Sequence, residues 1–160
     1  MNRNRPKAIC RRVARSWLAM KTWVKTWLFF LNAVFLAAFV FDDPLARWTL
    51  IAYVGAGVLL FPIMYCQRGL TRFLGIAHLI PWTPLLIYLE LRLTTDWVGL
   101  RIEWSADPAL FAWALLLWAS VVVCLGFDVF DVVRWARGER YVLGSEEAVR
   151  VGASLPAPRW

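Results

Sequence analysis

Four long apolar stretches, separated by short polar connections, constrain this chain more than any other feature of its sequence. They cover residues 22–41, 45–66, 73–93 and 109–127. A helix needs roughly 20 residues to cross the hydrocarbon core of a bilayer, which is about 30 Å thick. Soluble domains are only about half apolar, whereas 61% of these 160 residues are hydrophobic. The sequence therefore predicts an all-α integral membrane protein with four transmembrane helices in up-down threading.

Positive charge is distributed unevenly around these stretches. Seven Lys or Arg residues and no acid precede the first stretch, and an eighth, Lys25, lies at its start. Two basic residues follow the second stretch, and five follow the fourth. Because alternate connections lie on the same side of the membrane, one side holds fifteen basic residues and the other holds three. Basic flanks stay in the cytoplasm. We therefore expect a multi-pass protein of a bacterial-type inner (plasma) membrane, with both termini cytoplasmic and one membrane domain over residues 22–137.

The first 21 residues combine helical spacing with basic charge. Ile9, Val13, Trp17 and Met20 recur three or four residues apart, which places them on one helix face. Basic side chains occupy the other faces, so we expect an amphipathic helix on the cytoplasmic leaflet. A disordered arm and a translation start at Met20 are the alternatives. The predicted contacts with lipid headgroups are Arg11, Arg12, Arg15, Lys21 and Lys25.

The first apolar stretch follows a basic region, as the apolar part of a signal peptide does. Cleavage needs small residues near the end of that part, but Phe39, Val40 and Phe41 stand there. We therefore expect an uncleaved signal anchor.

The third stretch contains the residues that are least suited to lipid. Pro81 and Pro84 remove two amide donors, which predicts a kinked helix. His78, the only histidine, is predicted to lie about 7 Å from the cytoplasmic end of the span. An ionisable residue inside a span is a functional candidate. A neutral imidazole that is hydrogen-bonded to a neighbouring helix is the simpler interpretation.

Up-down threading brings the start of the third stretch and the end of the fourth to similar heights, so a hydrogen bond between His78 and Asp128 is within reach. Side chains of zinc-binding types gather toward the cytoplasmic side: Cys66, His78, Cys124 and Asp128. Their separations match no common metal-binding spacing, so we assign no metal, cofactor-binding or catalytic residue. Asn32, in the middle of the first stretch, is expected to hydrogen-bond across helices.

The remaining segments are connections and a tail. We expect an external loop over residues 94–108, whose Asp107-Pro108 pair starts the fourth helix. The apolar pattern of that helix continues past residue 127 to about residue 137. The cytoplasmic tail, residues 138–160, is too short for another domain and is expected to be partly disordered.

The sequence carries no motif that identifies a reaction. It contains no Gly-rich phosphate loop, GxSxG, HExxH or CxxC pattern, which are the common catalytic signatures. Charge beside the spans favours anionic lipid of the inner leaflet as the partner, and not nucleic acid. We expect a non-enzymatic accessory, assembly or interaction component with a membrane-protein partner or a second copy of itself.

Two other functions stay open. One is a small oligomeric transporter or channel that uses the kinked third helix and His78. The other is a haem- or metal-binding membrane protein, in which haem would need a histidine from a second copy.

Overall fold

The computed structural model describes residues 5–156, which form helices and loops without a β-strand. Four helical segments in this part are long and apolar enough to cross a membrane: Thr22–Val40, Pro44–Gln67, Arg72–Thr94 and Pro108–Ala136. The prediction of an all-α protein with four membrane-length helices is confirmed. The passage of these helices through a membrane in up-down order stays a prediction.

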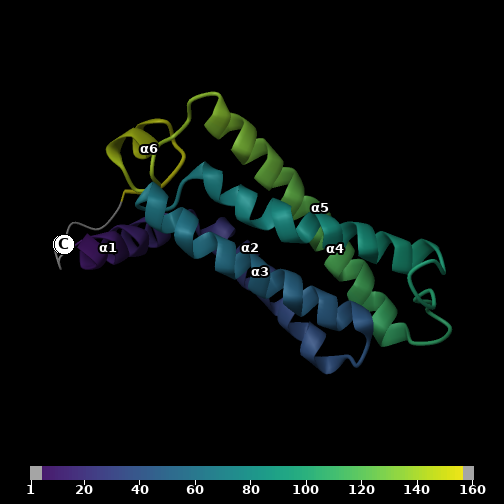
Figure 1. Cartoon of the computed structure of the whole chain (residues 1–160). Coiled ribbons are helices and arrows are strands. Elements are labelled where there is room, and N and C mark those ends of the chain that lie inside the picture. Colours follow the sequence, from purple (N-terminus) through teal and green to yellow (C-terminus); the bar gives the residue numbers. More distant parts are fainter. Residues whose placement is uncertain (1–4, 157–160) are drawn as a thin grey trace.

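The elements follow one another with short connections. They are α1 (Arg5–Leu18), α2 (Thr22–Leu36), the 3-10 turn η1 (Ala37–Val40), α3 (Pro44–Gln67), the 3-10 turn η2 (Arg72–Gly75), α4 (Ile76–Thr94), α5 (Pro108–Ala136) and the short α6 (Glu146–Arg150). Helix α4 packs between α3 and α5, and neighbouring helices run in opposite directions (Figure 1).

Two Asp-Pro pairs start the helices that follow the connections at one end of the bundle. The Asp43 carboxylate accepts the amide of Leu45 at 2.7 Å before α3. The Asp107 carboxylate accepts the amides of Ala109 and Leu110 before α5. A carboxylate at the start of a helix accepts hydrogen bonds from amides that have no partner inside the helix. The first turn tolerates proline, because an N–H at that position would have no partner in the helix.

Aliphatic, aromatic and small side chains form the interior of the bundle. Phe35 of α2 stacks on Trp82 of α4 with ring centroids 4.6 Å apart. The indole N–H of Trp113 in α5 donates to the carbonyl of Val34 at 2.9 Å. Gly55 of α3 faces Pro81 of α4, and a Cβ at residue 55 would lie 3.6 Å from the Pro81 side chain, in ordinary van der Waals contact.

Both prolines of the third stretch lie inside α4, which is helical without interruption from Ile76 to Thr94. The kink predicted at Pro81 and Pro84 stays a prediction. Helix α5 has 29 residues and is therefore about 43 Å long, which exceeds a hydrocarbon core of about 30 Å. Its last turns extend beyond the apolar part, in line with the predicted extension to about residue 137.

The tail differs from its prediction. Residues 139–156 fold back onto the bundle, where Leu143 donates its amide to Leu70 and Leu155 donates its amide to Ala19. Tyr141 is buried against the start of the third span. The prediction of partial disorder is therefore wrong for this segment, because backbone and side-chain partners on the helices fix it. The ends of the predicted arm and tail, residues 1–4 and 157–160, lie outside the described residues.

The tail, α1 and the turn between α3 and η2 lie together at one end of the bundle (Figure 1). We call this region the head: residues 9–20, 67–71 and 139–156. The loop between α4 and α5 lies at the opposite end (Figure 1).

Candidate functional site

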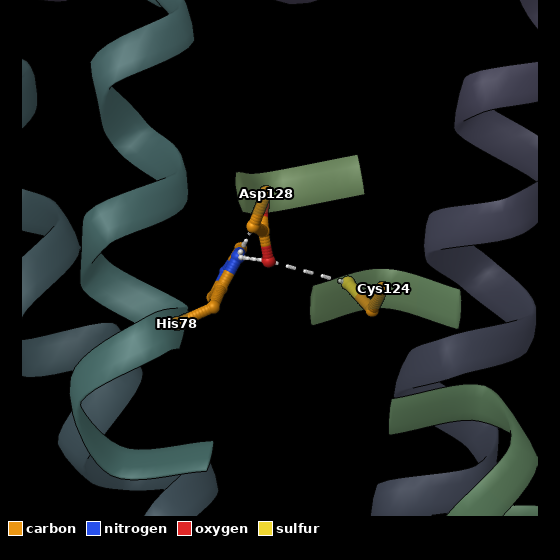
Figure 2. A group of neighbouring side chains, drawn as sticks. All are labelled: His78, Cys124 and Asp128. Carbon is orange, nitrogen blue, oxygen red and sulfur yellow. Dashed lines mark hydrogen bonds and ion pairs between the residues drawn. The ribbon is translucent and has the colours of Figure 1, made fainter. Parts of the chain in front are cut away.

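Three side chains with ligand atoms meet where α5 passes the start of α4 (Figure 2). Nδ1 of His78 lies 3.2 Å from Oδ2 and 3.4 Å from Oδ1 of Asp128. Sγ of Cys124 lies 3.6 Å from the same Oδ2. One ligand atom from each residue lies within 4.8 Å of the others. The predicted contact between His78 and Asp128 is thus present, and Cys124 joins it. Cys66, which sequence analysis grouped with these residues, is exposed at the end of α3 and lies outside this cluster.

The pairing of Cys124 with Asp128 has a local signal in the sequence, although it is not a common metal-binding spacing. Cys124 and Asp128 are four residues apart on one helix, and residues at that separation are neighbours on a helix face. His78 comes from another helix, which is why sequence spacing alone does not reveal the third member.

Gly75 permits the approach that completes the cluster. A Cβ at this position would lie 2.9 Å from the carbonyl oxygen and 3.0 Å from Cα of Asp128. Real Cβ atoms do not approach backbone so closely, so η2 reaches α5 only because residue 75 has no side chain. His78, three residues later, is thereby held beside Asp128.

The His78 ring is held by an aromatic stack as well. Its centroid lies 4.4 Å from that of Trp82, with 16° between the ring planes. Trp82 is buried and stacks on Phe35 in turn. The side chains of His78 and Asp128 are 18% and 14% exposed, while Cys124 is buried.

The order of the three groups bears on their chemistry. A thiol nucleophile is activated by an imidazole that lies between it and a carboxylate. Here the carboxylate of Asp128 lies between the imidazole and the thiol (Figure 2). This order differs from that of a catalytic triad. The three ligand types that meet here are ones that bind a metal ion such as zinc.

An arginine network follows one turn further along α5. Arg72 pairs with Asp131 and Glu139 and donates to the Tyr141 hydroxyl at 2.9 Å. Arg134 donates to Glu139 at 2.6 Å. Hydrogen bonding from Arg134 lowers the pKa of the Glu139 carboxyl, and the Tyr141 hydroxyl acts in the same direction. This network fastens the tail to the helices. No local sequence pattern predicts this network, because Arg72 is 59 positions from Asp131 and 69 positions from Tyr141.

A cavity of about 930 Å³ opens in the head between α1, the end of α3 and the tail. Four arginines and one acid are among its lining residues: Arg12, Arg15, Arg68, Arg150 and Glu146. Two of the predicted headgroup contacts, Arg12 and Arg15, therefore lie in this cavity.

The other predicted contacts lie elsewhere on the same end. Arg11 and Lys21 are exposed outside the cavity lining. Lys25 donates its ammonium to the Leu18 carbonyl at 2.9 Å, where it stabilises the C-terminal end of α1.

The remaining candidate, Asn32, is a link between helices. It donates its amide to the Leu28 carbonyl at 2.6 Å, and its carbonyl oxygen accepts the Tyr53 hydroxyl of α3. The predicted bond across helices is confirmed. It lies apart from the cluster around His78, which is at the head end.

The polar candidates from the sequence therefore differ in their surroundings. Asn32, Tyr53 and Trp113 tie helices together inside the bundle. The cluster of His78, Cys124 and Asp128 and the arginine-lined cavity both lie at or next to the head. No protein-family model, curated protein or solved structure matches this chain.

Proposed function

We propose that this protein is a non-enzymatic accessory component of a bacterial inner membrane whose head binds an anionic phospholipid. The arginine-lined cavity supports this proposal, because Arg12, Arg68 and Arg150 come from three segments that folding brings together. Guanidinium groups bind phosphate through paired N–H donors. With a single carboxylate among the lining residues, the cavity favours a negatively charged ligand.

The distribution of charge supports the cytoplasmic leaflet as the source of that ligand. The head carries the basic arm and the basic turn after α3, whereas the loop at the opposite end contains Asp96, Glu103 and Asp107. Basic segments beside a span stay in the cytoplasm, where anionic headgroups attract them at about 1 kcal/mol per residue. Both termini are then cytoplasmic.

The backbone at Arg68 is a second support. Arg68 follows the last residue of α3 with φ of 57° and ψ of 29°, in the left-handed region. This position after a helix is usually glycine, because a side chain costs about 1–2 kcal/mol there. A strained residue of this kind is a sign of function when its side chain lines a site.

The interior of the bundle favours a scaffold over a single-chain transport path. The polar contacts of Asn32 and Trp113 join helices to one another. Pro84, in the helix that a transporter would use, is exposed on the outside of the bundle. A path between several copies is the alternative that this arrangement leaves.

Lipid retention tests the proposal. Purified protein is exchanged into nanodiscs of phosphatidylcholine with increasing phosphatidylglycerol, and bound lipid is measured by native mass spectrometry. The triple variant Arg12→Gln/Arg68→Gln/Arg150→Gln should retain phosphatidylglycerol roughly tenfold less well, as the loss of several phosphate contacts predicts. The matched control Arg47→Gln/Arg101→Gln removes charges at the opposite end and should retain it normally. Equal retention by all three proteins would overturn the lipid assignment, and so would equally tight binding of inorganic phosphate.

Thiol labelling tests the orientation. Cys10 and Cys66 are exposed at the head end, so a membrane-impermeant maleimide should label them only after the cells are permeabilised. A cysteine introduced by Ser105→Cys in the opposite loop should be labelled in intact cells. The reverse pattern would place the head outside and remove the inner leaflet as its partner.

A further inference from the structure

We propose that His78, Cys124 and Asp128 bind one zinc ion, independently of any lipid in the head. The three residues supply an imidazole nitrogen, a thiolate and a carboxylate oxygen, which are the three kinds of protein ligand that zinc takes. They come from two helices that pack directly against each other. Hard ions such as Mg²⁺ and Ca²⁺ select oxygen ligands, so the imidazole and the thiol disfavour them at this site.

The distances fit a tetrahedral ion. Zinc lies at about 2.0 Å from nitrogen or oxygen and about 2.3 Å from sulfur, so neighbouring ligands are about 3.3 Å apart for nitrogen and oxygen and about 3.5 Å apart for sulfur and oxygen. In the structure, the His78 and Asp128 ligand atoms are 3.2 Å apart and those of Cys124 and Asp128 are 3.6 Å apart. Two of the three ligand edges therefore already have the length that coordination needs.

The charges balance as well. When zinc binds, the Cys124 thiol releases its proton to water and becomes a thiolate, Asp128 is a carboxylate, and His78 is a neutral imidazole. Two negative ligands cancel the two positive charges of the ion. A neutral site is favourable at the edge of a hydrocarbon core, where an uncompensated charge is costly.

The helices hold the ligands in place before the ion arrives. Cys124 and Asp128 are on successive turns of α5, the His78 ring is stacked on Trp82, and Gly75 lets η2 contact the backbone of Asp128. His78 and Asp128 keep part of their side-chain surface exposed, at 18% and 14%, so the ligand atoms are not sealed inside the bundle. Three protein ligands leave the fourth position to water, which makes the ion exchangeable.

Metal binding to the full-length purified protein tests the site. After chelation and desalting, Zn²⁺ should bind at one ion per chain by elemental analysis. Co²⁺ should give the visible bands of a tetrahedral ion and a near-ultraviolet thiolate band. Asp128→Asn and Cys124→Ser should each weaken Zn²⁺ binding at least about tenfold, and Cys124→Ser should abolish the thiolate band. The control Cys10→Ser/Cys66→Ser should bind like the original chain.

A second measurement does not depend on the folding of a ligand variant. In the Cys10→Ser/Cys66→Ser protein, Cys124 is the one thiol left, and Zn²⁺ should slow its alkylation, while Mg²⁺ should not. Absence of Zn²⁺ binding to the original chain, or alkylation of Cys124 at the same rate with and without Zn²⁺, would overturn the proposal. Binding that survives both Asp128→Asn and Cys124→Ser would overturn it too, since it would place the ion elsewhere. These outcomes leave lipid retention untouched, so each proposal fails separately.

Discussion

The guanidinium of Arg92, near the end of α4, lies 2.9 Å from the carboxylate of Asp43, which starts α3. Arg92 also donates to the Tyr88 hydroxyl at 3.2 Å, and its carbonyl accepts the amide of Ile102 in the following loop. Its side chain is only 6% exposed. One arginine therefore joins two helices and a loop at the end of the bundle opposite the head.

Loss of this arginine should destabilise the bundle strongly. Arg92→Met leaves the Asp43 carboxylate without its partner, and an unpaired charge at a buried site costs about 3–5 kcal/mol. The measurement is equilibrium unfolding in mixed micelles. Arg47→Met is the matched control, because its pair with Asp42 is exposed and such pairs contribute at most about 1 kcal/mol. Equal losses in the two variants would show that burial of Arg92 is unimportant.

A methyl group at Gly75 should separate η2 from α5. Gly75→Ala places a Cβ within 3.0 Å of the Asp128 backbone, and relief of such overpacking costs about 1–3 kcal/mol. We expect lower thermal stability and faster alkylation of Cys124. Gly126→Ala, on α5 with nothing within 4 Å of the added Cβ, should leave both unchanged. A stable Gly75→Ala protein with a protected Cys124 would contradict the close approach.

Docking of the tail should depend on pH through Glu139. Hydrogen bonds from Arg134 and Tyr141 lower the pKa of this carboxyl in the folded tail. A lowered pKa means that its stabilising contribution is present above the unfolded value of about 4.3 and is lost as pH falls through the folded value. The tail should therefore stay docked from neutral pH to about pH 5 and loosen below about pH 4.

In a Cys66→Ser protein, which removes the other exposed thiol, spin labels at Cys10 and at a cysteine introduced by Glu147→Cys would report this change as a longer distance. Glu139→Gln should lengthen the distance at neutral pH and remove most of the pH dependence. An unchanged profile in Glu139→Gln would assign the titration to another group, such as Asp131 beside Arg72.

Arg68→Gly should separate stability from ligand binding. Glycine adopts the left-handed conformation without strain, so unfolding should require about 1–2 kcal/mol more free energy. Retention of phosphatidylglycerol should fall in the same protein, because one of the cavity's guanidinium groups is lost. Unfolding by denaturant measures the stability, and native mass spectrometry measures the retained phosphatidylglycerol. A variant that is less stable, or one that binds lipid normally, would contradict the role given to Arg68.

The sequence predicted those features of the fold that depend on neighbouring residues. It did not predict those that depend on contacts between distant residues. The helix start at Asp107 followed from the Asp107-Pro108 pair, because capping involves only neighbouring residues. The tail was mispredicted, since its fixed conformation depends on Arg72, Leu70 and Ala19, which no local pattern links to residues 139–156. Burial of Arg92 was not foreseen either, because its partner Asp43 is 49 positions away.

The sequence by itself determined that the chain forms four membrane-length helices and that one end is basic. Length and apolar composition set the helices, and charges beside spans need no tertiary contact to be counted. Only the tertiary structure decided which side chains meet. The rotation of α5 brings Cys124 and Asp128 to His78, and the fold of the tail completes the arginine-lined cavity. These contacts depend on helix rotation and close packing at Gly75, and packing is a property of several segments at once.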